Sequence, residues 1–283
     1  MKKKTGREDF SEWKEFHSSS SGIFFKARRL FYQKKTSFQN IDIIENDYFG
    51  KVLLLDGLVQ ATERDEFFYH VMLVHPALVT HPGPENLLII GGGDGGALKE
   101  ILRYPIKNVC LTEIDAEVIE VAKKYFPWLL TALKYKRAEL VIADGSEYIQ
   151  KTDKKFDIVY IDSSDPVGPS SSLHEKSFYE KVKHRLGPEG IVAAQVGSLF
   201  YHQNSIAENA SFLREIFKEV HFYVGQVPTY PGGSWCYVLL SDMVNPSNIE
   251  RDPPPDLKYY NLEIHKAAFS LPNFMRDKFM ATR

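Results

Sequence analysis

Acidic residues stand in this 283-residue sequence at places where a carboxylate could bind a ligand or accept a proton. Each follows a short apolar stretch: Asp94, Glu113, Asp144, Asp162 and Asp165. If these stretches are parallel strands, their carboxyl ends meet at the edge of the sheet where ligands of open α/β folds bind. We expect Asp94, Asp162 and Asp165 to converge, and carboxylates so close repel one another unless a cation lies among them. The pattern therefore indicates a cationic ligand.

Two kinds of cation fit such a cluster, a metal ion and an ammonium group. Oxygen-rich clusters hold Mg²⁺, but no His or Cys spacing of a zinc site and no phosphate-binding lysine motif accompanies these acids. A primary ammonium has a pKa near that of lysine, about 10.4. It must lose a proton before it attacks as a nucleophile, and a buried carboxylate can accept that proton. We therefore expect an amine ligand and no metal.

Residues 87–96 read as a strand that runs into a glycine-rich turn. Gly91, Gly93 and Gly96 satisfy G-x-G-x-x-G, whose glycines permit a tight turn and the close approach of a ligand. Glu113 lies about 20 residues further on, where an acidic side chain can accept hydrogen bonds from both ribose hydroxyls. Together these features predict a nucleoside-containing ligand, and the alternative is a merely tight turn between strand and helix.

Asp94 and Asp144 bear on the kind of nucleoside. A dinucleotide places its pyrophosphate at this helix N-terminus, where Asp94 would repel it, whereas an adenosyl sulfonium brings a positive charge there. The alternative role for Asp94 is an N-cap or turn residue. Asp144 could accept a hydrogen bond from an adenine amino group while Gly145 lets the ring approach, and the alternative is an Asp-Gly turn that opens a helix at Ser146.

Several segments, in order, resemble the motifs of the polyamine aminopropyltransferase family, particularly those of members that act on putrescine. They are residues 55–70, 91–96, 113–115, 144–145, 162–169, 228–233 and 259–261. The resemblance implies an enzyme that transfers the aminopropyl group of decarboxylated S-adenosylmethionine to putrescine, giving spermidine and methylthioadenosine. It implies the sulfonium donor as a co-substrate, with no prosthetic group and no metal.

The same resemblance, together with the glycine motif, predicts the site residues. Those expected to bind the donor are Gln39, Gly91, Gly93, Asp94, Glu113, Asp144, Gly145, Asp162 and Pro169. Those expected to bind the acceptor amine are Gln60, Tyr69, His70, Asp94, Asp162, Asp165, Tyr230 and Trp235, with core packing as the alternative for Trp235. Asp162 matches the proton acceptor, and Tyr69 and Asp165 complete the catalytic set. Two departures from the family pattern are Asn40, after Gln39, and His174, where many relatives have Phe.

The acceptor and the reaction class each leave alternatives. Cadaverine, agmatine or a longer polyamine could replace putrescine, since one methylene changes binding by only about 1–3 kcal/mol. Residues such as Gln195, Tyr230 and Trp235 are expected at the far end of the amine channel. A methyltransferase that uses S-adenosylmethionine, and a non-catalytic polyamine sensor, are the alternatives from other classes.

The elements that position these residues fall into two regions. Short apolar runs separated by turns at residues 47–50 and 56–57 predict a small antiparallel β domain, residues 1–64. From Leu87, apolar strands alternate with amphipathic stretches, which predicts a Rossmann-like doubly wound sheet, like that of class I methyltransferases, within a catalytic domain of residues 65–283. Strands are expected at residues 87–90, 109–111, 140–142, 158–161 and 191–194, with a late strand at 237–240 and a helix within 63–80.

Composition excludes several partners. Lys and Arg number 35 against 37 Asp and Glu, so the formal charge of −2 offers no basic field for nucleic acid. No apolar run of about 18 residues predicts a membrane span, and the start of the chain lacks the apolar core of a signal peptide. Cys110 and Cys236 lie in apolar runs, which favours buried thiols in the cytoplasm. Relatives lead us to expect a homodimer or homotetramer formed through the N-terminal β region.

Overall fold

The computed structural model describes residues 11–164 and 168–281. The chain forms two units, one that ends at Asp65 and one that begins at Glu66. We describe each unit by itself, beginning with the smaller one.

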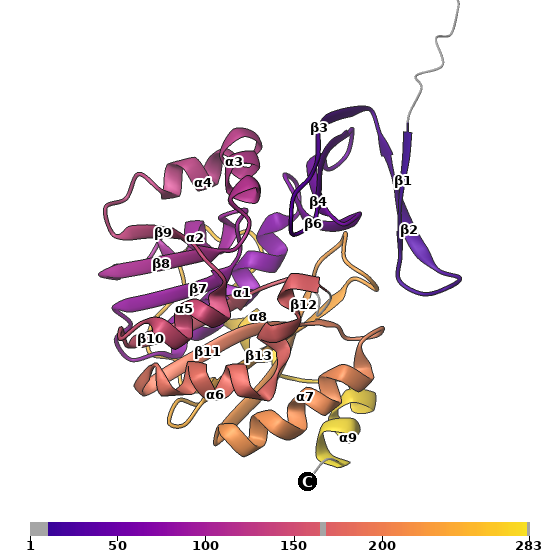
Figure 1. Ribbon diagram of the computed structural model, residues 1–283. Helices are drawn as coiled ribbons and strands as arrows, with labels where there is room; N and C mark the ends of the chain where they lie inside the picture. Colours follow the sequence, from indigo (N-terminus) through magenta and orange to yellow (C-terminus); the bar gives the residue numbers. More distant parts are fainter. Residues whose placement is uncertain (1–10, 165–167, 282–283) are drawn as a thin grey trace, which may run out of the picture. The chain divides into compact units, whose positions relative to one another are not determined.

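The N-terminal unit consists of antiparallel strands, as its sequence predicts (Figure 1). A two-stranded and a four-stranded sheet are formed by β1 (Ser11–Phe16), β2 (Gly22–Ala27), β3 (Arg29–Lys35), β4 (Asn40–Asn46), β5 (Gly50–Leu55) and β6 (Leu58–Thr62). Asp56 and Gly57 join β5 to β6 with φ values of +49° and +81°, the positive values that a two-residue hairpin turn favours. Asp56 Oδ1 accepts hydrogen bonds from the backbone and side-chain N–H groups of Asn40, at 2.9 and 2.7 Å. Asn40 therefore ties this turn to β4.

The C-terminal unit is built on one mixed seven-stranded sheet. Across the sheet the strands are β12 (Glu219–Gln226), β13 (Ser234–Ser241), β11 (Leu186–Ser198), β10 (Phe156–Asp162), β7 (Asn86–Gly91), β8 (Asn108–Glu113) and β9 (Ala138–Ile142). Strands β7 to β11 run parallel to one another, whereas β13 is antiparallel to both β11 and β12. The strand order reverses at β7, which lies between β8 and β10. Ligands of doubly wound sheets bind at such a switch point.

The predicted Rossmann-like sheet is confirmed, with a difference at one edge. Each expected strand is present, because strands buried on both faces read as uninterrupted apolar runs. Strand β12 was not predicted, since polar Glu219 and His221 interrupt its apolar residues. The late strand at 237–240 is part of β13, and its antiparallel direction makes the sheet mixed rather than wholly parallel.

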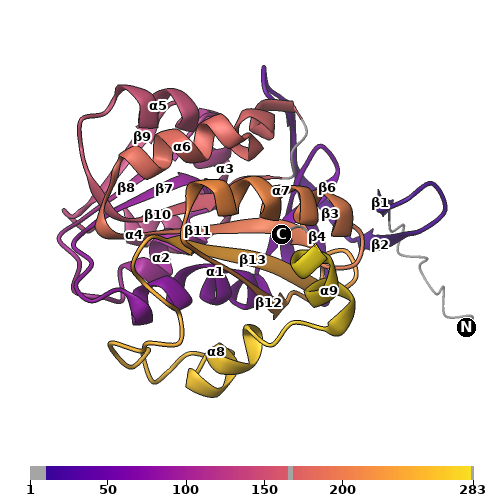
Figure 2. The ribbon, with the colours of Figure 1, turned by 90° about the horizontal axis from the view of Figure 1, so that it is seen from below.

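Helices cover both faces of this sheet. They are α1 (Glu66–Thr80), α2 (Gly96–Ile101), α3 (Ala116–Tyr125), α4 (Pro127–Ala132), α5 (Gly145–Lys151), the 3₁₀ helix η1 (Gly168–His174), α6 (Lys176–His184), α7 (Gln203–Ile216), α8 (Leu262–Ala268) and α9 (Asn273–Ala281). Figure 2 shows α5, α6 and α7 over one face and α1, α2 and α8 over the other. Within the described ranges, no helix has the length and apolar character needed to cross a membrane.

The core between sheet and helices explains why α1 is a rigid base for functional side chains. Every residue of α1 from Tyr69 to Thr80 is buried. On the other face, Phe178 of α6 and Leu213 of α7 pack against Val159 and Val192 of the sheet. Both cysteines are buried and free, as the sequence predicts. Side chains that leave α1 toward the strand ends are therefore held in fixed positions.

Candidate active site

Four of the predicted carboxylates lie at one edge of the sheet. Glu113 and Asp162 are the last residues of β8 and β10, and Asp144 follows β9 by two residues. Asp94 lies in the turn between β7 and α2. Because β7, β8, β9 and β10 are parallel neighbours, these positions share the carboxyl edge.

Asp162 is held on one side and unpartnered on the other. Tyr69 Oη donates a hydrogen bond to Asp162 Oδ1 at 2.6 Å. Asp162 Oδ2 is buried, and no described residue hydrogen-bonds to it. Burial raises the pKa of Asp162 to about 6, with His70 opposing that rise and Asp94 adding to it. Burial likewise raises the pKa of Tyr69 well above 10, so Tyr69 stays a hydrogen-bond donor while Asp162 can take up a proton near neutral pH.

The glycine-rich turn leaves space beside two carboxylates. The backbone N–H of Gly92 donates to the carbonyl oxygen of Asp162 at 2.8 Å, which joins the turn to the end of β10. A Cβ atom on Gly92 would lie 2.6 Å from Asp162 Oδ2, and one on Gly93 would lie 2.8 Å from Glu113 Oε2. Gly92 also has φ +68°, a left-handed conformation that other residues rarely adopt. Side chains in this turn would fill the room that a ligand needs next to both acids.

Glu113 is buried with few groups to stabilise its charge. Its Oε1 accepts a hydrogen bond from the backbone N–H of Asp115 at 2.9 Å. Burial raises the pKa of Glu113 to about 7, and backbone hydrogen bonds oppose that rise only in part. A buried carboxylate of this kind is well suited to accept hydrogen bonds from two neighbouring hydroxyl groups.

Asp94 belongs to a chain of alternating charges. Its Oδ1 accepts a 2.6 Å hydrogen bond from the backbone N–H of Gly96 and lies 3.4 Å from His70 Nε2. The other ring nitrogen, His70 Nδ1, lies 2.8 Å from Glu66 Oε2. Glu66 Oε1 accepts from Lys99 Nζ at 2.7 Å. Burial alone would raise the pKa of Asp94, but His70 and the Gly96 N–H hold it below its usual value.

Asp144 caps the helix that follows it, which is the structural alternative to adenine binding. Its Oδ1 accepts from the backbone N–H groups of Ser146 and Glu147, at 2.7 and 3.1 Å, and so caps α5. A Cβ atom on Gly145 would lie 2.2 Å from Ile90 Cγ2, so glycine lets α5 pack closely against β7. Adenine recognition by Asp144 and Gly145 stays a prediction beside this structural role.

Aromatic and amide side chains lie beside Tyr69. The Tyr230 ring is 5.5 Å from that of Tyr69 and 4.7 Å from that of Trp235, measured between centroids. Gln195 Nε2 donates to the carbonyl oxygen of Ser163, which follows Asp162, at 2.7 Å. Gln195 Oε1 and Trp235 Nε1 are buried, and neither has a hydrogen-bond partner in the described part of the chain. One acceptor, on Gln195 next to the end of β10, and one donor, on Trp235 against Tyr230, thus have no partner among the described residues.

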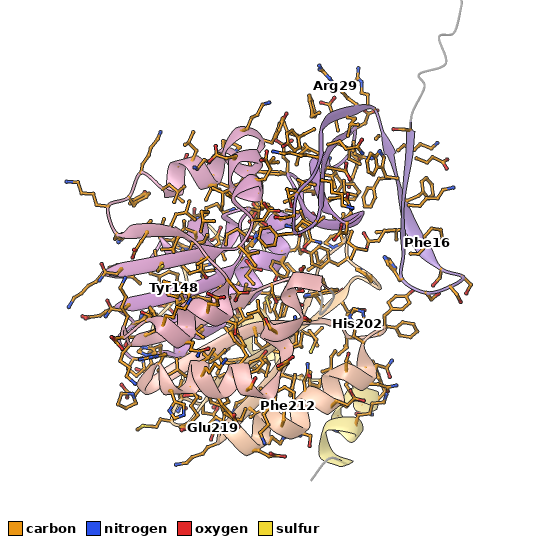
Figure 3. All side chains as sticks on the ribbon, viewed as in Figure 1. Phe16, Arg29, Tyr148, His202, Phe212 and Glu219 are labelled. Carbon is orange, nitrogen blue, oxygen red and sulfur yellow. The ribbon has the colours of Figure 1, made fainter. Side chains whose placement is uncertain are left out.

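Trp235 also packs against the start of α7. The ring of His202, labelled in Figure 3, lies edge-to-face to Trp235 at a centroid distance of 6.3 Å. Trp235 is 5% exposed, so the expected alternative of core packing describes most of its surface. Its indole N–H has no acceptor among the described residues, and a buried donor of this kind normally has a polar partner.

The other predicted residues belong to the N-terminal unit, to η1 or to the part of the chain outside the described residues. Gln39 and Gln60 belong to the N-terminal unit, between β3 and β4 and in β6 respectively. Asp165 lies outside the described residues, and Pro169 is in η1. His174, the departure from the family pattern, has its Nε2 3.3 Å from both Ser163 Oγ and the carbonyl oxygen of Ser164.

Two charged residues of the site were not predicted. Glu66 stands four residues before His70 on α1, a spacing that places two side chains on one helix face. That signal was present in the sequence. Lys99 reaches Glu66 only through the packing of α2 against α1, which no local pattern reveals. Within the described ranges, no group of three or more His, Cys, Asp or Glu is placed to hold a metal ion.

Comparison with known proteins covers both units. Residues 66–252 match the family model of the spermine/spermidine synthase domain, and residues 13–63 match that of the spermidine synthase tetramerisation domain. The polyamine aminopropyltransferase of Shouchella clausii (strain KSM-K16) is 40% identical over 259 residues, 90% of this chain and 94% of the relative. That of Caldicellulosiruptor saccharolyticus is 42% identical over 258 residues, 90% and 93% of the two chains.

Solved structures give the same result. A spermidine synthase in complex with the transition state analogue AdoDATO has a TM-score of 0.92 and 36% identity, covering 96% of this chain and 95% of that one. Spermidine synthase from Thermotoga maritima has a TM-score of 0.91 and 36% identity, covering 96% and 94%.

Proposed function

The chain belongs to the spermine/spermidine synthase family, and from that premise we propose that it transfers the aminopropyl group of decarboxylated S-adenosylmethionine to putrescine, giving spermidine and methylthioadenosine. Its relatives are named polyamine aminopropyltransferases, and a similar solved structure is described with the analogue AdoDATO. The observation that carries the proposal is Asp162, whose Oδ1 is held by Tyr69 while its buried Oδ2 has no partner among the described residues.

The donor lies along the carboxyl edge in this proposal. Glu113 accepts hydrogen bonds from the ribose hydroxyls, supported by its burial and by the absence of a side chain at Gly93. Asp94 binds the ammonium group of the aminopropyl chain. Intact S-adenosylmethionine carries a carboxylate at that point, which Asp94 would repel. The other proposed donor contacts are Gln39, Gly91, Asp144, Gly145, Asp162 and Pro169.

The acceptor lies beside Tyr69 and Asp162. The residues proposed to bind it are Gln60, Tyr69, His70, Asp94, Asp162, Asp165, Tyr230 and Trp235. Gln195 joins this set. Its Nε2 donates to the carbonyl oxygen of Ser163 at 2.7 Å, but its buried Oε1 accepts no hydrogen bond from any described residue. An ammonium group of the acceptor would supply that donor. Putrescine is the proposed acceptor because the segments that resemble the family are most similar to its putrescine-using members.

The reaction needs one proton transfer and one displacement. Asp162 Oδ2 takes a proton from the ammonium group of putrescine, and Tyr69 holds Oδ1 so that the carboxylate does not rotate. The free amine attacks the carbon of the aminopropyl group bonded to sulfur. The C–N bond forms as the C–S bond breaks. The electron pair of the C–S bond goes to sulfur, and methylthioadenosine leaves as a neutral molecule. Alignment of the two substrates can contribute about 7–11 kcal/mol to the lowering of the barrier.

A competition assay tests the proposal. The purified protein is incubated with an equimolar mixture of carbon-13-labelled putrescine and unlabelled cadaverine, agmatine and spermidine, once with decarboxylated S-adenosylmethionine and once with S-adenosylmethionine, and products are identified by mass spectrometry. With the decarboxylated donor, carbon-13-labelled spermidine with equimolar methylthioadenosine is expected. A product of another amine would reassign the acceptor. Methylated amine formed from S-adenosylmethionine would indicate a methyltransferase, and binding without turnover would indicate a sensor.

A further inference from the structure

His70 lies in an unusual position for a residue expected to touch the acceptor amine. The residue is 1% exposed. Its Nδ1 is 2.8 Å from Glu66 Oε2 and its Nε2 is 3.4 Å from Asp94 Oδ1. Both ring nitrogens therefore face carboxylate oxygens, so neither is directed at a substrate.

This arrangement requires a particular protonation state. A neutral imidazole has one N–H group, and its other nitrogen presents a lone pair. That lone pair would face the oxygen of either Glu66 or Asp94, and the contact would be repulsive. Only the imidazolium, with two N–H groups, satisfies both carboxylates. Burial by itself would lower the pKa of His70, but the two carboxylates overcome that effect and hold the pKa well above 6.5.

The glycine motif makes room for the ring. A Cβ atom on Gly96 would lie 2.1 Å from His70 Cε1, so the third glycine of the motif is needed for His70 to reach Asp94. The backbone N–H of Gly96 donates to Asp94 Oδ1 at 2.6 Å. Trp128 Nε1 donates to the backbone carbonyl oxygen of Asp94 at 2.9 Å. Asp94 is thus held through its backbone and through one carboxylate oxygen.

We propose that His70 is a permanently charged positioning residue, which holds Asp94 Oδ1 so that the second carboxylate oxygen meets the ammonium group of the donor. The inference rests on the proposed function, because it takes Asp94 as the donor contact. It reassigns His70 from the acceptor amine to the support of Asp94. Lys99, bonded to Glu66 at 2.7 Å, continues the support away from the ligand.

The charges around His70 come from several elements. Glu66 lies on its own helix, Asp94 in the turn before α2, Asp162 at the end of β10, and Lys99 on α2 beyond Glu66. The imidazolium lowers the pKa of both Asp94 and Asp162. A neutral residue at position 70 therefore leaves two buried acids without their shared cation, and the pKa of each rises.

Nitrogen-15 NMR of the histidine-labelled full-length protein at pH 8 tests the protonation state without any substrate. An ordinary histidine, with a pKa near 6.5, is neutral at that pH. The resonances of His70, identified by their absence in His70→Gln, are expected to show two protonated ring nitrogens. A neutral tautomer at pH 8 would overturn the proposal, whether or not the protein proves to be an aminopropyltransferase.

Calorimetric titration of His70→Gln then separates a positioning role from a structural one. We expect affinity for decarboxylated S-adenosylmethionine to fall on the order of ten- to a hundredfold, the loss of a hydrogen bond to a charged group, while affinity for uncharged methylthioadenosine stays the same. His221→Gln, on β12 beside Glu219, is the matched control and keeps both affinities. An equal loss of affinity for both ligands would show that His70 only supports the fold.

The pH dependence of the transfer rate is a second test of the role of His70. In His70→Gln, the pH at which the transfer rate reaches half of its plateau is expected to be higher than in the unmodified protein, because Asp162 loses a neighbouring cation and its pKa rises. An unshifted profile would contradict the proposal. If the unmodified protein transfers no aminopropyl group, the proposed function fails, and the NMR measurement still decides the state of His70. Should the variant fail to fold, the ring resonances of His70 are assigned by through-bond correlation to its own backbone, and the NMR result still decides.

Discussion

Asp162 and Tyr69 show how one buried pair can supply both a base and its alignment. A carboxylate with a pKa of about 6 is mostly ionised at neutral pH and still basic enough to share a proton with a reacting amine. Tyr69 donates at 2.6 Å and fixes one oxygen, which leaves the other for the incoming group. A free surface aspartate, with a pKa near 3.9, would be a weaker base by about two orders of magnitude.

Replacing Tyr69 by Phe removes that hydrogen bond and keeps the ring. We expect the pKa of Asp162 to rise, since the Tyr69 hydroxyl lowers it, and the transfer rate at neutral pH to fall roughly 10- to 100-fold. The measurement is the transfer rate between pH 5 and pH 9 with saturating substrates. Tyr179→Phe, which removes a buried hydroxyl from α6, is the control. A Tyr69→Phe enzyme with an unchanged rate would exclude the aligning role.

For single residues, the sequence predicts where the acidic side chains lie on the sheet better than it predicts which residues they hydrogen-bond or pair with. Asp94, Glu113 and Asp162 could be recognised because strand ends and a glycine turn are local patterns. The sequence could not decide whether Asp144 caps a helix or binds a ligand, since an Asp-Gly turn is compatible with both roles. The link from Lys99 to Glu66 depends on two helices packing together, and this information is absent from any single segment.

The elements that carry the site are the ones whose sequence patterns were clearest. Strands β7, β8 and β10 are short apolar runs because both of their faces are buried, and α1 is buried along most of its length. Strand β12 and the hairpin of β1 and β2 were not predicted, because exposed polar residues alternate with apolar ones there. The catalytic edge could thus be predicted where burial was complete.

The turn between β7 and α2 gives a prediction for an element. Gly92→Ala places a Cβ atom 2.6 Å from Asp162 Oδ2, in a backbone with φ +68°. We expect the free energy of unfolding to fall by about 1–2 kcal/mol and the transfer rate by on the order of 10²-fold, the effect of misplacing a catalytic group. Denaturant titration and steady-state kinetics measure the two effects.

Gly187→Ala is the control for that substitution. The nearest neighbouring atom to a Cβ on Gly187, in β11, would lie at 3.8 Å, and the glycine has no left-handed conformation. Stability and rate should therefore stay near those of the unmodified protein. If Gly92→Ala behaved like Gly187→Ala, the space beside Asp162 would have no part in binding or catalysis.

At the scale of the whole molecule, a chain with a formal charge of −2 carries a local excess of acids at one edge of its sheet. The net charge hides this excess, because the 35 Lys and Arg spread over the whole chain offset nearly all of its 37 Asp and Glu. The N-terminal unit matches a model described as a spermidine synthase tetramerisation domain, and it carries well-exposed aromatic side chains, Phe16, Phe24 and Tyr48. We propose that this unit joins copies of the chain.

Sedimentation equilibrium of the full-length protein tests that assembly. We expect a homodimer or homotetramer at micromolar concentration, since apolar side chains on an antiparallel unit favour burial against a second copy. Phe16→Ser together with Phe24→Ser should shift the mass toward the monomer, whereas Phe274→Ser, an exposed aromatic on α9, should not. A monomer in the unmodified protein would contradict the proposal.

Asp162 as the proton acceptor is the central claim, and the single-turnover rate of aminopropyl transfer in Asp162→Asn tests it most directly. The unmodified protein should show a rate that rises with pH through about 6 to a plateau. The variant should bind decarboxylated S-adenosylmethionine with largely intact affinity, because Glu113 and Asp94 remain, yet transfer about 10²–10⁴-fold more slowly, without that rise. A variant that keeps the rate and the pH profile of the unmodified protein would contradict the account.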